Sequence, residues 1–408
     1  MKILMTAYAV NPYKGSEDGM GWNFVCQAAR FHKIIAITRK NNRSYIERYL
    51  SYHDFEGKEN LQFAYYDLPY WMRFWKIKSF GALLYFYLWQ LFIPLFIRRN
   101  KLSFDIVHNL NFHNDWTPST LWIFKKPMVW GPIGHHPRIP KGYILPIYGY
   151  LAYLKDRIKH FTKVFIRKVD PFLMQTILKS DKVLTMNSAS RNLIDPLHKK
   201  SILLPSVGTE KVRINKYQHD IFRVLSIGRF VPLKGFDMSI KSFHRFYNKL
   251  SDKEKIQSEL ILVGAGPKKK MLKKMAKDYG IEKAIVFVDW MKRDELVKLY
   301  NQSQVFLFPS HEGAGMVVAE ALSFAMPVIC YDNTGPGEFI NNTCGLKVPY
   351  TNYHDSIQHF ANHLTNLYEN KKFRQKLSEG AQKQFLELFE WNKKGEQLAE
   401  VYRQLLTA

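Results

Sequence analysis

Two glutamates flank a glycine turn in the second half of the chain. Glu312 stands before Gly313 and Gly315, just after the apolar run Val305–Pro309, and Glu320 follows eight residues later. Where a strand ends in a glycine turn that opens a helix, the first backbone N–H groups and the helix dipole bind phosphate. A carboxylate in the second helical turn can accept hydrogen bonds from both hydroxyls of a ribose, and one on the turn can reach a sugar hydroxyl. The pattern favours a site for phosphate and sugar over a helix-start charge and an unrelated surface acid.

A second glycine segment carries two fixed cations. The apolar run Phe222–Ile227 leads into Gly228 and Arg229, and Lys234 and Gly235 follow six residues further on. Glycines at the end of a strand let the backbone approach a ligand closely, and the two cations would lie beside it. This arrangement suits a diphosphate, although the same residues alone are also common in turns.

The elements around these segments alternate between short β-rich runs and helical stretches. This is the pattern of a parallel sheet with crossover helices, and it restarts near residue 206. A chain of 408 residues exceeds what one core usually fills, so we expect two α/β domains. The predicted strands are Lys2–Ala7, Ile34–Thr38, Leu61–Tyr65, Ile106–Asn109, Met128–Trp130, Lys182–Met186, Phe222–Ile227, Leu260–Val263, Ala284–Val288, Val305–Pro309 and Pro327–Cys330.

Cysteine usage and the first residues bear on the compartment. The three cysteines, Cys26, Cys330 and Cys344, suit a reducing compartment and offer neither a disulfide framework nor a zinc site. Neither a D-x-D triplet nor an H-E-x-x-H helix supports metal chemistry. The segment Met1–Val10 reads as a buried strand and not as a secretion signal.

The net charge requires a polyanionic partner. The chain has 60 basic and 35 acidic residues, a formal charge of +25. Nucleic acid, anionic lipid and phosphorylated substrates all fit this charge. Because no nucleic-acid-binding signature is present, we expect no nucleic acid and rank a membrane surface and a sugar nucleotide above it.

Two apolar segments interrupt the alternating plan. Phe80–Ile97 reaches the minimum length of a transmembrane helix, but Gln90 and Pro94 within it favour a core helix. Lys141–Lys168 carries seven Lys or Arg and one acid, with apolar residues at helical spacing. Such a basic amphipathic helix can lie on an anionic membrane, as could the aromatic segment Tyr70–Trp75, or the helix can dock on the protein by its apolar stripe. The stripe comprises Ile144, Ile147, Leu151, Leu154, Ile158, Phe161 and Phe165.

These motifs resemble those of the retaining glycosyltransferases of family four, which have the GT-B fold. The E-x₇-E spacing of Glu312 and Glu320 and the G-R-x₄-K-G segment Gly228–Gly235 are the donor-site marks of that family. Asn11–Trp22 resembles its glycine-rich first loop, and Trp130–Gly134 resembles a segment of a bacterial branch that makes surface polysaccharides.

The resemblance implies an α/β fold of two Rossmann-like domains that face each other across a cleft. Residues 1–205 would bind the acceptor, residues 206–385 the nucleotide sugar, and residues 386–408 would form a helix that packs back on the first domain. The reaction would move a sugar from a nucleotide-diphosphate sugar to a hydroxyl of a glycan or lipid-linked glycan, with retention and without metal or cofactor. A UDP-sugar is favoured over a GDP-sugar. The basic amphipathic segment Lys141–Lys168 adds the expectation that the enzyme is cytoplasmic and peripheral on the inner face of the cell membrane, an anionic surface.

The resemblance also assigns roles to residues. The implied catalytic residues are Arg229, Lys234, Glu312 and His135. The implied donor-binding residues are Gly15, Ser16, Gly228, Arg229, Lys234, Glu312, Gly313, Ala314, Gly315, Met316, Val317 and Glu320. His113 and Glu17 would contact the acceptor or the sugar. The histidines considered for the place near the donor sugar, each expected in a loop after a strand, are His108, His113, His135 and His136.

Three positions depart from the family pattern. Ala314 stands where the family often has Phe, Ala325 where it usually has Gly, and Asp289 where a glycine is common. Asp289 lies near the edge of the sheet where the nucleotide base is expected to bind, and it leaves the identity of that base undecided. The alternatives are a sugar-nucleotide epimerase of the same fold, against which the glutamate pair argues, and a non-catalytic basic protein that binds membrane or nucleic acid.

Overall fold

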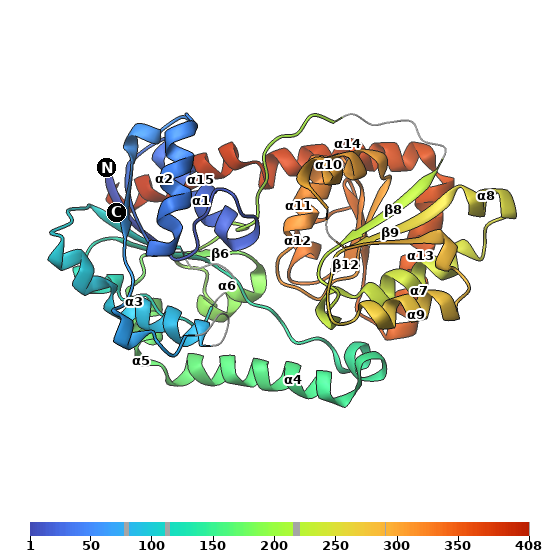
Figure 1. Ribbon diagram of the computed structural model, residues 1–408, viewed down its shortest axis with the longest axis horizontal. Coiled ribbons are helices and arrows are strands. Elements are labelled where there is room, and N and C mark those ends of the chain that lie inside the picture. The colour runs from blue at the N-terminus through green and yellow to red at the C-terminus, as the bar shows by residue number, and fades with distance from the viewer. Residues whose placement is uncertain (77–80, 111–114, 215–220, 290, 408) are drawn as a thin grey trace. The chain divides into compact units, whose positions relative to one another are not determined.

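The structure is a computed structural model that describes residues 1–76, 81–110, 115–214, 221–289 and 291–407. The chain forms two compact units. Unit 1 comprises Met1–His135, Phe161–Ser206 and Trp391–Ala408, and unit 2 comprises His136–His160 and Val207–Glu390. Each unit is a parallel sheet with helices on both faces (Figure 1).

The sheet of unit 1 has seven strands, with β4 at its centre. Its strand order is β3-β2-β1-β4-β5-β6-β7, and every pair is parallel. The five inner strands β1, β2, β4, β5 and β6 are almost wholly buried because helices cover both faces, which is why they read as continuous apolar segments. The strands are β1 Lys2–Ala7, β2 Lys33–Thr38, β3 Leu61–Tyr65, β4 Ile106–Leu110, β5 Met128–Ile133, β6 Lys182–Thr185 and β7 Ser201–Leu203.

The helices of this part of the chain include α3, which covers most of the apolar segment Phe80–Ile97. Helix α3 buries Tyr85, Trp89, Ile93 and Ile97 in the core of unit 1, as expected of a core helix. Within the described residues no helix is long and apolar enough to cross a bilayer. The helices are α1 Ser16–Ala29, α2 Arg43–Tyr52, α3 Ala82–Arg99, α4 Lys141–Val169, α5 Pro171–Lys179, α6 Ser188–Ile194 and α15 Trp391–Thr407, with short 3-10 helices η1 Lys40–Asn42, η2 Lys58–Asn60, η3 Tyr70–Met72 and η4 Leu121–Phe124.

The sheet of unit 2 has the same plan, with the order β10-β9-β8-β11-β12-β13. Its strands are β8 Phe222–Ile227, β9 Ser258–Val263, β10 Ile285–Val288, β11 Val305–Phe308, β12 Val328–Tyr331 and β13 Gly345–Val348. Its helices are α7 Phe236–Tyr247, α8 Asp252–Ile256, α9 Lys269–Asp278, α10 Arg293–Gln302, α11 Met316–Ser323, α12 Pro336–Phe339, α13 Tyr353–Glu369 and α14 Lys371–Leu388, with η5 Pro232–Lys234 and η6 Glu282–Ala284. All the predicted strands are present, and the short β7 and β13 were not predicted.

Residues 136–160 pack with unit 2, whereas sequence analysis counted them with the N-terminal domain. Ile139, Tyr143 and Ile144 are buried in the core of unit 2. The Tyr143 hydroxyl lies 2.7 Å from the Ser356 hydroxyl, and the Tyr148 hydroxyl donates to the Asp237 carboxylate. Buried aromatic side chains whose hydroxyls have such partners stabilise the packing of residues 136–160 in unit 2.

The last helix, α15, packs in unit 1. Its Trp391 ring lies 5.4 Å from that of Phe24 in α1, edge to face. Its Lys394 donates to the Pro205 carbonyl at 2.6 Å. The preceding residues to Glu390 stay with unit 2, so the change of unit falls between Glu390 and Trp391 and not at residue 386.

Candidate functional site

The two motif segments lie at the switch point of the sheet in unit 2. The chain runs from β8 to β9 and β10 on one side, and from β11 to β12 and β13 on the other. Ligands of open parallel sheets bind where the strand order reverses, beyond the carboxyl ends of the central strands. The segment Gly228–Gly235 follows β8 and the turn Ser310–Gly315 follows β11, its neighbour in the sheet.

Close backbone contacts hold these two segments together. Gly235 has φ +65°, and a Cβ there would lie 2.0 Å from the Pro309 carbonyl oxygen, so only glycine fits. The His311 N–H donates to the Leu233 carbonyl at 2.9 Å. The Ser310 hydroxyl donates to the same oxygen at 3.2 Å. Side chains on the two segments are thereby brought within reach of one another.

Lys234 and Glu312 form an ion pair between the two segments. The Lys234 Nζ lies 2.5 Å from the Glu312 Oε2, and the side chains are only 18% and 12% exposed. The Lys234 Nζ also lies 5.3 Å from the centre of the Phe308 ring. Burial raises the pKa of Glu312, and the charge and hydrogen bond of Lys234 act against that rise. An anion at this point would compete with Glu312 for the lysine.

Glycines support the first segment, including two that sequence analysis missed. Arg229 is exposed directly after Gly228. A Cβ on Gly264 would lie 1.9 Å from the Gly228 carbonyl oxygen, and one on Gly266 2.6 Å from that of Phe230. The Gly-Ala-Gly sequence after β9 is the signal that could have identified this support, because it also ends a central strand.

The glycine turn after β11 opens helix α11 as predicted. Gly315 is the N-cap residue, and α11 starts at Met316. A Cβ on Gly335 would lie 2.4 Å from the Glu312 carbonyl oxygen, so Gly335 supports the turn from below the helix start. Ala314 is buried, whereas Met316 and Val317 are half-buried.

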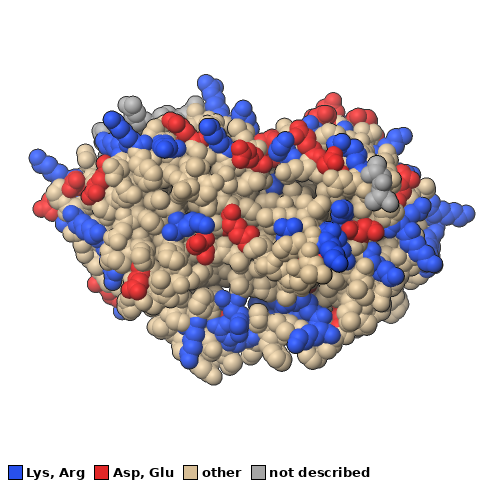
Figure 2. All heavy atoms as spheres, turned by 180° about the vertical axis from the view of Figure 1, so that it is seen from behind, with Lys and Arg blue, Asp and Glu red and all other residues tan. Residues whose placement is uncertain are grey.

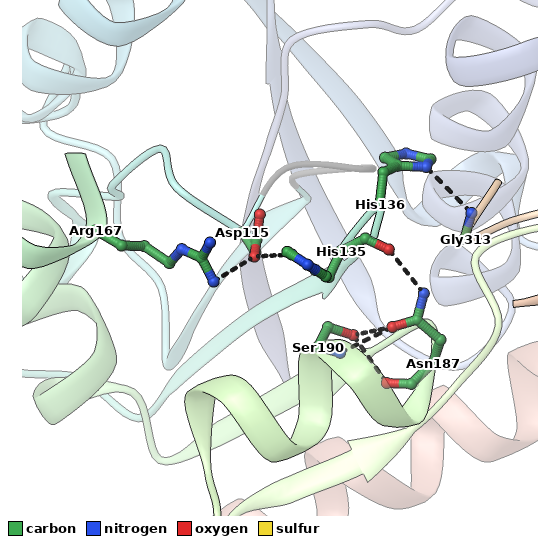
Figure 3. A network of polar contacts seen from close by, with 7 residues as sticks. All are labelled: Asp115, His135, His136, Arg167, Asn187, Ser190 and Gly313. Atoms are coloured by element: carbon green, nitrogen blue, oxygen red, sulfur yellow. Dashed lines mark hydrogen bonds and ion pairs between the residues drawn. The ribbon is translucent and has the colours of Figure 1, made fainter. Parts of the chain in front are cut away.

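The Gly313 N–H, one of the predicted phosphate donors, already has an acceptor. It donates to the His136 Nδ1 at 3.2 Å, within unit 2 (Figure 3). The Nδ1 must therefore be unprotonated in this arrangement. His136 is thus a histidine of unit 2 that contacts the glycine turn, and it stands beside His135, which together with His113 was predicted to lie near the donor sugar.

Glu320 binds two donors from α10. The Arg293 Nη1 lies 2.7 Å from its Oε1, and the Tyr300 hydroxyl donates to its Oε2 at 2.9 Å. Glu320 is 15% exposed and is not a free surface acid, whereas Arg293 is half exposed. Tyr300 is buried and stacks on Phe324, and burial together with Glu320 raises its pKa. A ribose would have to share Glu320 with these two donors or displace the exposed arginine.

The switch point of unit 1 lies between β1 and β4. Gly15, Ser16 and Glu17 are exposed at the start of α1, and Gly15 is its N-cap residue. A Cβ on Gly21 would lie 2.0 Å from the Ala9 carbonyl oxygen, so glycine lets the loop after β1 lie on this helix. His113, which follows β4, lies outside the described residues.

His108 is a core residue, and the prediction that it lies in a loop is wrong. It belongs to β4 and is fully buried. Its Nδ1 lies 2.6 Å from the Tyr402 hydroxyl and its Nε2 lies 2.8 Å from the Gly131 carbonyl oxygen. Burial lowers the pKa of His108 to about 4. Its role is to tie the sheet to α15.

His135 lies in a charge network of unit 1. Its Nδ1 lies 3.0 Å from the Oδ2 of Asp115, which Arg167 also contacts at 3.2 Å (Figure 3). Its carbonyl accepts a hydrogen bond from Asn187 at 3.1 Å. Burial would raise the pKa of Asp115, but the His135 hydrogen bond and the charges of Arg167, His135 and Lys163 together lower it. Asp115 and Arg167 were not predicted, because nothing local marks them.

Two departures from the family pattern have structural correlates. Ala325 has φ +53°, a conformation that favours glycine, which is the residue usual in the family at this position. Asp289 follows the edge strand β10 and pairs with Lys269 of α9.

The comparisons with known proteins follow the same lines. Residues 209–384 match the family model of the glycosyl transferases group 1. This match contains both glycine segments, Lys234 and the two glutamates.

Two curated relatives resemble parts of the chain. An uncharacterized glycosyltransferase of Haemophilus influenzae is 29% identical over 162 residues, which cover 38% of this chain and 43% of that protein. A GDP-mannose-dependent alpha-(1-6)-phosphatidylinositol monomannoside mannosyltransferase of Mycolicibacterium smegmatis is 30% identical over 125 residues, which cover 29% of this chain and 31% of that protein. The chain therefore spans less than half the length of these relatives.

Solved structures resemble the chain over its whole length. Sucrose-phosphate synthase from Thermosynechococcus elongatus has a TM-score of 0.65 at 16% identity and covers 100% of this chain and 99% of its own. HepE from Anabaena, in complex with UDP and glucose, has a TM-score of 0.60 at 15% identity. The match covers 99% of this chain and 100% of the HepE chain. At these identities the likeness concerns the fold, and it confirms the predicted GT-B architecture of two Rossmann-like domains.

Proposed function

We propose that the protein is a retaining glycosyltransferase that uses a nucleotide-diphosphate sugar. One observation carries the proposal. Lys234, Glu312 and Glu320 follow two adjacent strands at the switch point of unit 2, inside the group 1 match. A cation and two carboxylates in these places suit a diphosphate, a sugar and a ribose.

In the proposed reaction the bond between the anomeric carbon and the diphosphate oxygen breaks, and the acceptor oxygen bonds to that carbon on the same face. The acceptor proton passes to the leaving diphosphate. Arg229 and Lys234 neutralise the charge that develops on the leaving group, Glu320 holds the ribose, and Glu312 orients the sugar. Catalysis rests on positioning and electrostatic stabilisation and needs no metal.

The donor and acceptor are proposed by class only. Nucleotide sugars with uracil or guanine fit the proposal, since one relative is named for GDP-mannose and one structural neighbour binds UDP. The acceptor is a hydroxyl of a glycan or a lipid-linked glycan, as in surface polysaccharide synthesis. Thermal shift with UDP and GDP would distinguish the bases, because a bound ligand raises stability by mass action.

Release of nucleoside diphosphate from UDP- and GDP-sugars tests the proposal. We expect Lys234→Met and Glu320→Gln each to lower turnover about 100-fold or more, since each removes charge-assisted contacts to the donor. Lys274→Met is the matched control, because Lys274 also pairs with a carboxylate, that of Asp278, but at an exposed place, and its turnover should stay near that of the wild type. Near-normal turnover in both site variants would refute the donor site, and a strict loss of activity with EDTA would refute the metal-free mechanism.

A further inference from the structure

The apolar stripe of α4 changes its environment partway along the helix. Ile144 is buried in the core of unit 2, so the first part of the stripe docks on the protein. Gly149 then breaks the helix, with φ 80° and ψ 175°. Beyond it the stripe is exposed: Leu151 is 82% exposed and Phe161 69%. The exposed members, which recur every three or four residues and so share one face, are Leu151, Leu154, Ile158, Phe161 and Phe165.

Three charged side chains of α4 outside the stripe are held by the protein, and two of them, Lys163 and Arg167, lie on the opposite face. Arg167 pairs with the buried Asp115, and Lys163 is buried. Arg157 donates to the Ile139 carbonyl oxygen. A surface helix of a soluble protein normally shows the reverse polarity, with its apolar stripe on the core and its charges in water. Docking by the apolar stripe therefore fails as an explanation for residues 151–165.

The exposed apolar surface continues within unit 1 onto neighbouring elements. Val169 at the end of α4 and Phe172 and Leu178 of α5 are all exposed. The Tyr87 hydroxyl of α3 hydrogen-bonds to Asp170, the residue between these two helices. Leu83 lies one turn before Tyr87 on the same face of α3 and is also exposed.

An aromatic loop lies at the start of α3. Tyr70, Trp71 and Phe74 are all exposed by more than half. A Cβ on Gly81 would lie 2.6 Å from the Trp75 ring, so this loop contacts the residue that precedes α3. Exposed Tyr and Trp beside an apolar surface are typical of side chains that lie at the headgroup level of a bilayer.

The charges around the stripe have a single sign. Every exposed charged residue of the fully described segment 150–179 is a lysine. These are Lys155, Lys159, Lys168 and Lys179. The acids of the segment, Asp156 and Asp170, are half-buried and buried. Along the lower edge of the view in Figure 2, uncharged side chains lie among basic ones.

We propose that this surface, consisting of the exposed stripe of α4 with α5, Leu83 and the loop 70–74, inserts into the headgroup region of an anionic bilayer. An interfacial helix needs an apolar face to insert and basic residues at its flanks, and it does not span the membrane. A second copy of the chain is the poorer occupant, because the two rows of lysines would repel each other. Anionic lipid supplies the opposite charge. The proposal does not depend on the transferase activity.

Co-flotation of the purified full chain with vesicles tests this surface. The vesicles are phosphatidylglycerol with phosphatidylethanolamine, and neutral phosphatidylcholine, at a series of salt concentrations. We expect binding to the anionic vesicles that weakens with salt as charges are screened but retains a residual part, owing to the inserted side chains. Phe161→Ser with Phe165→Ser should lower the partition coefficient at least about tenfold. The matched control, Tyr52→Ser with Ile256→Ser, removes exposed apolar groups elsewhere and should leave it unchanged.

Two double variants, each of which reverses two lysine charges, test the role of the lysines. Lys159→Glu with Lys168→Glu should strongly reduce the salt-sensitive part of binding. Lys372→Glu with Lys376→Glu, which change the charge equally and lie exposed on α14, should reduce it much less. Unchanged melting temperatures and donor hydrolysis would show that the variants are folded. Equal losses in test and control variants, no binding to anionic vesicles at any salt, or a dimer that Phe161→Ser with Phe165→Ser dissociates would each overturn the proposal.

Discussion

The Gly313 N–H donates to Nδ1 of His136, so one backbone donor before α11 is held by a side chain from the segment 136–160. The contact fixes both the turn and the unprotonated state of that nitrogen. Because a glycine turn has few other restraints, a side-chain acceptor of this kind keeps the remaining donors aligned for an anion.

If the proposed donor site is correct, His136→Ala should lower kcat/KM for donor hydrolysis about tenfold, since the turn loses its acceptor. His136→Asn, whose amide oxygen can take the place of Nδ1, should retain most of the activity. His354→Ala, on the exposed surface of α13, serves as the control. An alanine variant as active as the control would show that the hydrogen bond has no part in positioning.

At the level of elements, the C-terminal end of α4 contacts the rest of unit 1 through the ion pair of Arg167 with Asp115 and not through its apolar stripe. Arg167 contacts the fully buried Asp115 at 3.2 Å. Removing one partner of a buried pair leaves an uncompensated charge, so Arg167→Leu should lower the free energy of unfolding by roughly 3 kcal/mol at pH 7. Lys168→Leu, its exposed neighbour, should change stability by less than about 0.5 kcal/mol.

The pH dependence of this variant follows from Asp115. Its pKa is lowered in the folded protein, so its contribution is complete above the ordinary value of about 3.8 and is lost as the pH falls through the folded value. Without Arg167 that pKa rises. The difference between wild type and Arg167→Leu in urea unfolding should therefore narrow between pH 7 and 4, and a constant difference would exclude Asp115 as its source.

For the whole molecule, connectivity is the distinctive feature. The chain changes unit four times, after His135, His160, Ser206 and Glu390. Within unit 1, a hydrogen bond joins the segment after the last change of unit to the segment before the third. The buried Lys394 of α15 donates to the Pro205 carbonyl oxygen at 2.6 Å. Burial lowers the pKa of Lys394 to about 7.

This lysine should give the protein a stability that rises with pH above neutrality. Below pH 7 Lys394 is protonated in both the folded and the unfolded state. The folded protein then carries the full free-energy cost of a buried charge, and its free energy of unfolding is lowest. Between about 7 and the ordinary value near 10.4 the unfolded chain binds the extra proton, so the free energy of unfolding rises with pH. Lys394→Met should lack this rise in denaturant titrations at pH 7, 8 and 9. Parallel pH profiles for the two proteins would disprove the shifted lysine.

Local patterns in the sequence were sufficient to predict two α/β units and to place Lys234 and Glu312 just after two strands. Parallel strands buried on both faces read as apolar runs, and the glycines beside Lys234 and Glu312 mark strand ends directly. The pairing of Lys234 with Glu312 follows from the adjacency of β8 and β11.

Tertiary structure alone decided the rest, because it depends on residues far apart in the chain. Helical spacing shows that Leu151, Phe161 and Phe165 share a face, but only the packing of α4 shows that this face meets solvent. Likewise His108 is held by Tyr402 and the Gly131 carbonyl oxygen, and His136 contacts the glycine turn, because each is positioned by partners more than 20 residues away. Periodicity defines the faces of an element, whereas which face is covered depends on what the whole chain brings against it.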